Sequence, residues 1–309
     1  MDVSLDNATI LVTGGSGFLG RYCLQRLDKQ RANVHAVSRT RNGRAADGVT
    51  WHQLDLRVPG AADELIATLR PSHLLHLAWV ATPETYRDSP ENVDWLEASL
   101  ALLHAFGQYG GRRLVGIGSS AEYGFTEGAC LEDVTAIRPL SIYGKCKAAL
   151  SIATDAYANR FGFSAAWGRV FLIFGPGDSP LRLFPSLLAA IVAGKPVRLT
   201  DGRQIRDFIY ISDAAGALVC LLENADANGV FNIGTGRGIA VRQAMECFAD
   251  KLGARDLLQI GALPRRPDEP LSLVADMSKL ERVLSWRAPT PFEIGLDAVL
   301  ANAAPITRR

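Results

Sequence analysis

A glycine-rich turn near the N-terminus constrains this 309-residue chain more than any other feature. The apolar run at residues 9–13 predicts a buried strand, residues 14–20 read Gly-Gly-Ser-Gly-Phe-Leu-Gly, and helical apolar spacing follows. Such glycines let the chain turn tightly and let a pyrophosphate approach backbone N–H groups at a helix N-terminus. A tight strand–helix turn without a ligand is the alternative, but the context favours a dinucleotide site. The residues assigned to it are Gly14, Gly17, Phe18, Leu19 and Gly20.

Alternating strand and helix patterns predict the fold class. Strand-like runs lie at residues 33–38, 73–78, 113–118 and 165–174, and helical patterns lie between them at 61–69, 92–106 and 141–160. This order predicts an α/β protein with a Rossmann-type, doubly wound parallel sheet. After residue 174 prolines become frequent and the rhythm loosens, which predicts a smaller, mostly C-terminal α/β substrate domain.

Composition excludes several classes of protein. Lys plus Arg is 33 and Asp plus Glu is 32, so a net charge of +1 removes the electrostatic case for nucleic-acid binding. The five cysteines contain no C-x-x-C and the five histidines no ligand spacing, so we expect neither a disulfide framework nor a metal site. The apolar stretches are far shorter than the ~18 residues that span a bilayer, and the first residues do not resemble a signal peptide. We therefore expect a cytoplasmic protein without a membrane segment.

The end of the second predicted strand bears on the cofactor. Ser38 stands where an acidic residue would hold the adenosine ribose of NAD, and Arg39 follows it. Because a guanidinium fits a 2′-phosphate with paired hydrogen bonds, this pair predicts NADP(H) over NAD(H), unless Arg39 is a solvated surface residue. Asp55 lies beyond a further apolar stretch and either meets the adenine edge or caps a helix.

Tyr143 and Lys147 are the candidate reactive pair. Four residues apart, they share one face of a helix that begins soon after Pro139. A nearby ammonium and the helix dipole are expected to lower the pKa of the tyrosine from about 10, so that it exchanges a proton near neutral pH. Two solvated helix residues are the alternative, but position favours a site. The pair follows a strand that ends in Ser119 and Ser120, where such sheets bind ligands.

Taken in order, these features resemble the extended short-chain dehydrogenase/reductase family, in particular its NAD(P)-dependent nucleotide-sugar epimerases, dehydratases and reductases. The similarity covers nearly the whole length. Further matching segments are residues 76–78 (His-Leu-Ala), 119–124 (Ser-Ser-Ala-Glu-Tyr-Gly), 175–178 (Gly-Pro-Gly-Asp), 206–213 and 266–269. The resemblance implies a dinucleotide-binding domain at 1–173 and 205–235, and a nucleotide-sugar-binding domain at 174–204 and 236–309.

The resemblance also implies roles for individual residues. Tyr143 would be the acid/base, and Lys147 would tune it and bind a cofactor ribose hydroxyl. Ser119, or Ser120 if the match slips by one, would orient the reacting oxygen. Arg206 and Arg266 match arginines that hold the substrate diphosphate, with ordinary ion pairs as the alternative. Further predicted cofactor contacts are Ser38, Arg39, Asp55, Leu56, Leu77 and Ala78, and Thr82 is a predicted substrate contact beside Trp79 and Tyr86.

Other polar residues are expected to be structural. His76 reads as a satisfied core histidine, and Asn92 as a residue with a local role. Dehydratases carry acids directly after the catalytic Ser/Thr, whereas this chain has Ser120 and Ala121 there. Glu122 is one residue late, and strand alternation points it to the other face. Helices 92–106 and 141–160 commonly pair across dimers in this family, so a homodimer is expected.

Three functions remain open at this point. The leading hypothesis is NADPH-dependent reduction of a nucleotide-linked 4-keto-6-deoxy sugar at C4, with Tyr143 protonating the oxygen; Arg39 and the missing dehydratase acids motivate it. The runner-up is an NAD-dependent nucleotide-sugar 4-epimerase, which needs the same Ser, Tyr and Lys. The third is a non-catalytic dinucleotide-binding sensor, which would tolerate Tyr143→Phe.

Overall fold

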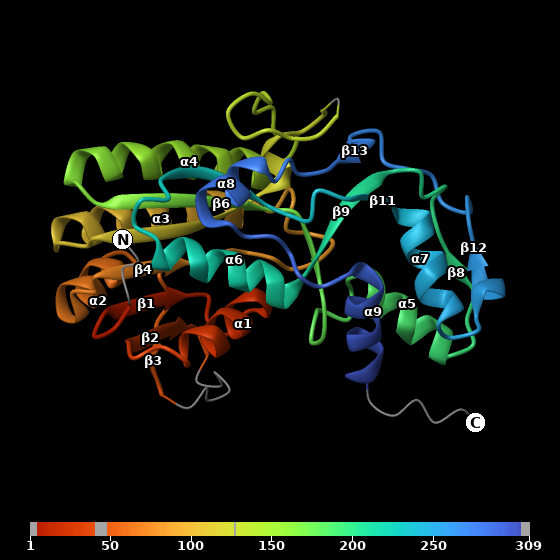
Figure 1. The fold of residues 1–309 in the computed structure, drawn as a ribbon, viewed down its shortest axis with the longest axis horizontal. Coiled ribbons are helices and arrows are strands. Elements are labelled where there is room, and N and C mark those ends of the chain that lie inside the picture. Colours follow the sequence, from red (N-terminus) through yellow and green to blue (C-terminus); the bar gives the residue numbers. More distant parts are fainter. Residues whose placement is uncertain (1–4, 41–47, 127, 304–309) are drawn as a thin grey trace.

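A seven-stranded parallel sheet forms the larger part of the protein. The computed structural model describes residues 5–40, 48–126 and 128–303 (Figure 1). The strands follow the order β10-β6-β5-β4-β1-β2-β3, so the winding reverses between β1 and β4. This arrangement confirms the predicted doubly wound sheet. The strands are β1 (Thr9–Thr13), β2 (Asn33–Ser38), β3 (Val49–Gln53), β4 (His73–His76), β5 (Arg113–Ser119), β6 (Ser164–Val170) and β10 (Gly229–Ile233).

Helices cover both faces of this sheet because its strands are apolar on both sides. In β1, Ile10 and Val12 pack into one buried cluster and Leu11 into the other, as alternation along a strand requires. Helices α1 (Phe18–Leu27) and α6 (Ile211–Glu223) complete the first cluster. Helices α2 (Ala61–Leu69), α3 (Glu91–Gln108) and α4 (Ile142–Phe161) cover the opposite face. In the three described stretches, no helix combines the length and the hydropathy that crossing a membrane requires.

A second, smaller sheet lies beside the first (Figure 1). It joins β7 (Leu172–Phe174), β9 (Ile205–Tyr210), β11 (Gly238–Ala240) and β13 (Ser272–Leu273), and β8 (Val197–Arg198) pairs separately with β12 (Leu258–Gln259). A cluster rich in phenylalanine, including Phe174, Phe184, Phe208 and Phe248, forms its core. The surrounding helices are α5 (Leu183–Val192), α7 (Val241–Asp250) and α9 (Phe292–Ala301), while α8 (Ser278–Leu284) packs on β10.

The structure differs from the sequence-based elements at the junction of the two sheets. The run predicted as one strand at 165–174 is two strands, because the chain bends at Phe171 and β7 leaves β6 to pair with β9. The sequence patterns also indicate no strand at β9 and no helix at α6. Within the predicted stretch 205–235, β9 belongs to the second sheet and β10 to the first. The domain boundaries therefore stay a prediction.

Candidate active site

A pocket of about 760 Å³ lies at the carboxyl ends of the first sheet's strands and reaches the second sheet. It starts at the glycine loop, crosses the ends of β4 and β5, and ends between β9 and the segment 266–273. The reversal of the winding between β1 and β4 is where such sheets bind ligands. Predicted site residues that line it are Gly14, Gly17, Phe18, Leu19, Gly20, Ser38, Arg39, Leu56, Leu77, Ala78, Ser119, Ser120, Tyr143, Lys147, Arg206 and Arg266.

The glycine loop has the shape that a pyrophosphate requires. Gly14 has a φ of +71°, and a Cβ there would lie 2.7 Å from the backbone nitrogen of Ala78. A Cβ at Gly20 would lie 2.2 Å from the carbonyl oxygen of Gly14. Helix α1 follows with Gly17 as its N-cap, a residue with no side chain to cover the first N–H groups. The loop therefore fits the diphosphate of a dinucleotide.

At the adenosine end of the predicted cofactor site, only some of the predicted residues line the pocket. The buried Ser38 hydroxyl lies 3.1 Å from that of Ser16, and Arg39 is exposed at the pocket edge. Asp55 is outside the pocket lining and is neither a helix cap nor free, because it accepts the Arg57 side chain at 2.8 and 3.1 Å. That hydrogen bond lowers the pKa of Asp55. Thr82 is exposed and also lies outside the lining.

Tyr143 lies at the beginning of α4, where Ser141 caps the helix by accepting the Gly144 N–H at 3.1 Å. The helix thus begins where the sequence predicted. The predicted lowering of the tyrosine pKa is wrong for this structure. Burial raises the pKa of Tyr143, the neighbouring Tyr86 ring at 5.0 Å raises it further, and a hydrogen bond with Ser119 lowers it only in part. Tyr143 and Ser119 nevertheless line the same pocket, as the acid/base hypothesis requires.

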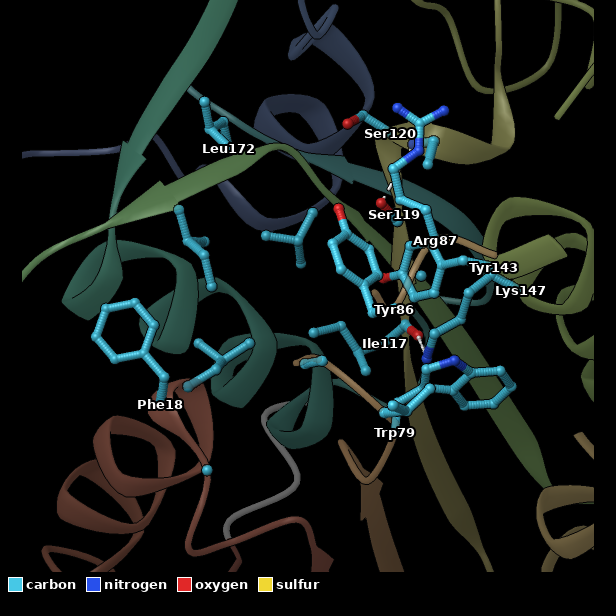
Figure 2. Close-up of a pocket in the computed structure, with 18 of the residues that line it drawn as sticks. Phe18, Trp79, Tyr86, Arg87, Ile117, Ser119, Ser120, Tyr143, Lys147 and Leu172 are labelled. Carbon is cyan, nitrogen blue, oxygen red and sulfur yellow. Dashed lines mark hydrogen bonds between the residues drawn. The ribbon is translucent and has the colours of Figure 1, made fainter. Parts of the chain in front are cut away.

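Lys147 is fully buried one turn along α4, and it points to the strand end rather than to the phenol. Its Nζ donates to the Ile117 carbonyl at 2.9 Å and lies 3.9 Å from the centre of the Trp79 ring (Figure 2). Burial lowers the pKa of Lys147 to about 7, against a smaller raising effect of Glu122. Lys147 is therefore not among the groups that shift the pKa of Tyr143.

Arginines gather at the far end of the pocket. Arg206, on β9, is 12% exposed and donates to Glu269 at 2.9 Å, and the exposed Arg266 lies beside the same opening. Sequence reasoning missed two further lining residues, Arg87 and Arg182; the Arg182 guanidinium lies 5.3 Å from the centre of the Tyr86 ring. Arg87 lies in the turn segment between β4 and α3, and Arg182 is the N-cap of α5, so neither belongs to a periodic pattern and only the folded structure brings them to the site.

Three buried polar residues near the pocket have protein partners for their side chains. Both ring nitrogens of His76 bond buried hydroxyls, at 2.7 and 2.9 Å. Asn92 accepts the indole N–H of Trp79 at 2.8 Å and donates to two backbone carbonyls, so it fixes the ring under Lys147. Glu122 lies outside the pocket lining, fully buried against Arg169 at 2.7 Å.

Comparison with known proteins agrees with this geometry. Residues 10–234 match the model of the NAD dependent epimerase/dehydratase family. The UDP-glucose 4-epimerase of Corynebacterium glutamicum is 26% identical over 318 residues, which cover 96% of this chain and 95% of that relative. The UDP-glucose 4-epimerase of Bacillus subtilis is 26% identical over 335 residues, covering 95% of each chain.

Solved structures show the same likeness. The structure of MoeE5 in complex with UDP-glucuronic acid and NAD is 31% identical, with a TM-score of 0.84 over 95% of this chain and 98% of that one. The Thermus thermophilus UDP-glucose 4-epimerase in complex with NAD is 27% identical, with a TM-score of 0.83 over 95% and 98% of the two chains. Since the family model spans most of the sequence and the fold matches along nearly all of it, this chain belongs to the NAD dependent epimerase/dehydratase family.

Proposed function

We propose that this protein is a nucleotide-sugar 4-epimerase that uses a nicotinamide dinucleotide. The observation that carries the proposal is the convergence of Ser119, Tyr143 and Lys147 in one pocket, between a glycine loop shaped for a pyrophosphate and a group of arginines. Relatives named UDP-glucose 4-epimerase align over nearly the whole chain, which favours the epimerase over the leading reductase hypothesis and favours UDP as the nucleotide.

In this reaction the chain's own residues handle the proton. Tyr143, once ionised to the phenolate, takes the proton of the C4 hydroxyl when the sugar is oxidised, and the resulting phenol returns it when the sugar is reduced on its other face. Ser119 donates a hydrogen bond that holds the reacting oxygen beside the phenol. A nicotinamide dinucleotide held by the glycine loop would supply the hydride acceptor and donor for C4. Because burial keeps the free Tyr143 protonated, a positive charge brought beside it must lower its pKa during the reaction.

The far end of the pocket fits a nucleoside diphosphate. Guanidinium groups bind phosphate oxygens in pairs, and Arg206 and Arg266 flank the opening together. Gln204 lies beside them, 6% exposed, and its Oε1 lacks a partner among the described residues, so it offers an acceptor to a ligand N–H or O–H. The predicted Thr82 contact would require a movement of the loop after β4.

A second candidate is the NADPH-dependent reductase of a nucleotide-linked 4-keto-6-deoxy sugar. The exposed Arg39 at the pocket edge favours it, since a 2′-phosphate would pair with this side chain. The solved structures of MoeE5 and of the Thermus thermophilus enzyme contain NAD. A comparison of NADPH and NADH binding to the wild type and to Arg39→Ser tests the cofactor prediction; a clear preference of the wild type for NADH would contradict it.

The test of function is a direct one. The purified protein is incubated with UDP-glucose, UDP-galactose and the corresponding uronates, with and without added NAD, and products are identified by NMR. Interconversion at C4 without net change of the dinucleotide supports the epimerase. Oxidation of NADPH only in the presence of a 4-keto sugar supports the reductase. Nucleotide-sugar binding without turnover, together with unchanged binding by Tyr143→Phe, supports the sensor.

We also propose the homodimer that the family resemblance implies. Helices α3 and α4 pack against each other and expose Val93 (47%) and Ile152 (73%). Sedimentation of the wild type and of Ile152→Asp tests this assembly, since a charge in an apolar interface disfavours association. A monomeric wild type at micromolar concentration would contradict it.

A further inference from the structure

Glu122 is a buried carboxylate that the reaction above does not use. It is the last residue of the short helix η1 (Ser120–Glu122), which follows β5 directly. Its side chain is fully buried, and its two oxygens accept three hydrogen bonds from three different parts of the chain. Oε1 accepts the Ser119 backbone N–H at 2.8 Å and the Trp167 indole N–H at 3.1 Å, and Oε2 accepts the Arg169 Nε–H at 2.7 Å.

The surroundings hold this carboxylate in one place. Arg169 also donates to the Tyr123 hydroxyl at 3.2 Å, and that hydroxyl donates to Asn232 at 2.7 Å. The carboxylate packs against β5 at Gly118, where only glycine leaves enough space. A Cβ at this position would lie 2.4 Å from Oε1 and 2.2 Å from the Trp167 nitrogen. A charged group so fully satisfied has little freedom to move.

Glu122 fixes the position of Ser119. Its backbone N–H is fixed by Glu122, and its own Oγ accepts the Ala121 N–H at 3.2 Å, so the two ends of η1 cap each other. Because one lone pair of the Ser119 oxygen is used by Ala121, the Ser119 hydroxyl hydrogen stays free to donate into the pocket that Tyr143 also lines. The carboxylate thus sets the position of a hydroxyl that the proposed function places beside the reacting oxygen.

We propose that Glu122 is a positioning residue for the reaction: through the Ser119 backbone it holds the Ser119 hydroxyl in the pocket that Tyr143 lines. The inference rests on the proposed function, since Ser119 and Tyr143 act there on the C4 oxygen. A buried ion pair contributes little net stability compared with an apolar pair of equal volume, so fold stability alone does not account for Glu122 and Arg169. Small misplacements of a reacting group cost about 100-fold in rate.

A double-mutant cycle tests the role. Glu122→Met combined with Arg169→Met replaces the ion pair by apolar side chains of similar length, which protects the fold, and Trp167→Phe is the matched control that leaves the Ser119 contact in place. Each is made in the wild type and in Ser119→Ala. We expect the Met pair to lower kcat about 10- to 100-fold with Ser119 present and less than about threefold in Ser119→Ala, with the KM of the nucleotide sugar nearly unchanged. Trp167→Phe should lower kcat less than about threefold in both backgrounds.

Equal losses of kcat in the two backgrounds would overturn the proposal, because the Met pair would then act independently of Ser119. A loss in Trp167→Phe as large as that of the Met pair would also overturn it. Hydrogen exchange of residues 118–121, read by mass spectrometry, provides a result that does not depend on turnover. Exchange should quicken in the Met pair and stay unchanged in Trp167→Phe. A wild type that turns over no nucleotide sugar would refute the proposed function. Unchanged exchange of residues 118–121 in the Met pair would refute the positioning of Ser119, whatever the turnover.

Discussion

Replacing Lys147 by methionine should stabilise the protein against unfolding. The lysine is fully buried, and its ammonium has only the Ile117 carbonyl at 2.9 Å and the Trp79 ring at 3.9 Å as close partners among the described residues. Burial therefore disfavours the charged form and lowers its pKa from 10.5 to about 7. Methionine has a similar length and carries no charge to desolvate.

The size of the effect follows from linkage. Each pKa unit corresponds to about 1.4 kcal/mol, so a fall from 10.5 to about 7 corresponds to about 5 kcal/mol as an upper bound. The variant loses the hydrogen bond to the Ile117 carbonyl, which reduces its gain in stability by about 1 kcal/mol. At about pH 6, below both pKa values, we expect the Lys147→Met protein to be more stable by about 2 to 4 kcal/mol.

The contribution of Lys147 to stability changes with pH in the opposite direction to that of a lysine in an ion pair. Between about pH 7 and 10.5 the unfolded lysine binds a proton that the folded one has lost, so Lys147 makes the wild type more stable as the pH rises through this window. The advantage of Lys147→Met should therefore shrink by up to about 1.4 kcal/mol per pH unit. Urea unfolding of both proteins from about pH 6 to 9.5 measures it. A difference that stays constant across this range, or a less stable variant at about pH 6, would refute the reasoning.

Three further predictions concern single steps of the account. Tyr143→Phe should lower kcat at least about 1,000-fold and change dinucleotide affinity less than about threefold, by turnover and calorimetry; retained turnover would contradict the acid/base role. Gly20→Ala should abolish dinucleotide binding and destabilise the protein by about 2 kcal/mol, because its Cβ would lie 2.2 Å from the Gly14 oxygen; normal binding by calorimetry would contradict the loop geometry. Arg206→Met should raise the KM of the nucleotide sugar about 10- to 100-fold with a smaller effect on kcat, and an unchanged KM would refute diphosphate binding there.

Most of the first sheet was predictable from the sequence because its strands and helices largely alternate with clear periods; the edge strand β3 was not predicted. Its core strands lie buried under helices on both faces, so each reads as a short apolar run. The second sheet was not predictable. Its strands are two to six residues long, and β13 pairs with β9 across a long stretch of chain, so no local pattern marks either. Helix α6 escaped notice because it is buried nearly all round, which removes the polar face that reveals a helix.

In the site, too, local sequence features were predictable and features that depend on the folded structure were not. The spacing of Tyr143 and Lys147 and the strand-end serines are local features, and the structure brings them to one pocket. The pKa of Tyr143 is raised by burial and by Tyr86, which lies in the loop after β4, so spacing alone predicted the wrong direction for this pKa. Arg87 and Arg182 likewise reach the pocket only through the folded loops.

The central claim is that Tyr143 assists reversible hydride removal from C4 of a nucleotide sugar. The most direct measurement follows UDP-glucose deuterated at C4, incubated with the protein and NAD, by NMR. The account predicts formation of UDP-galactose that keeps the deuterium at C4, and no such product with Tyr143→Phe. A C4 epimer formed with loss of the label, or formed equally well by Tyr143→Phe, would contradict it.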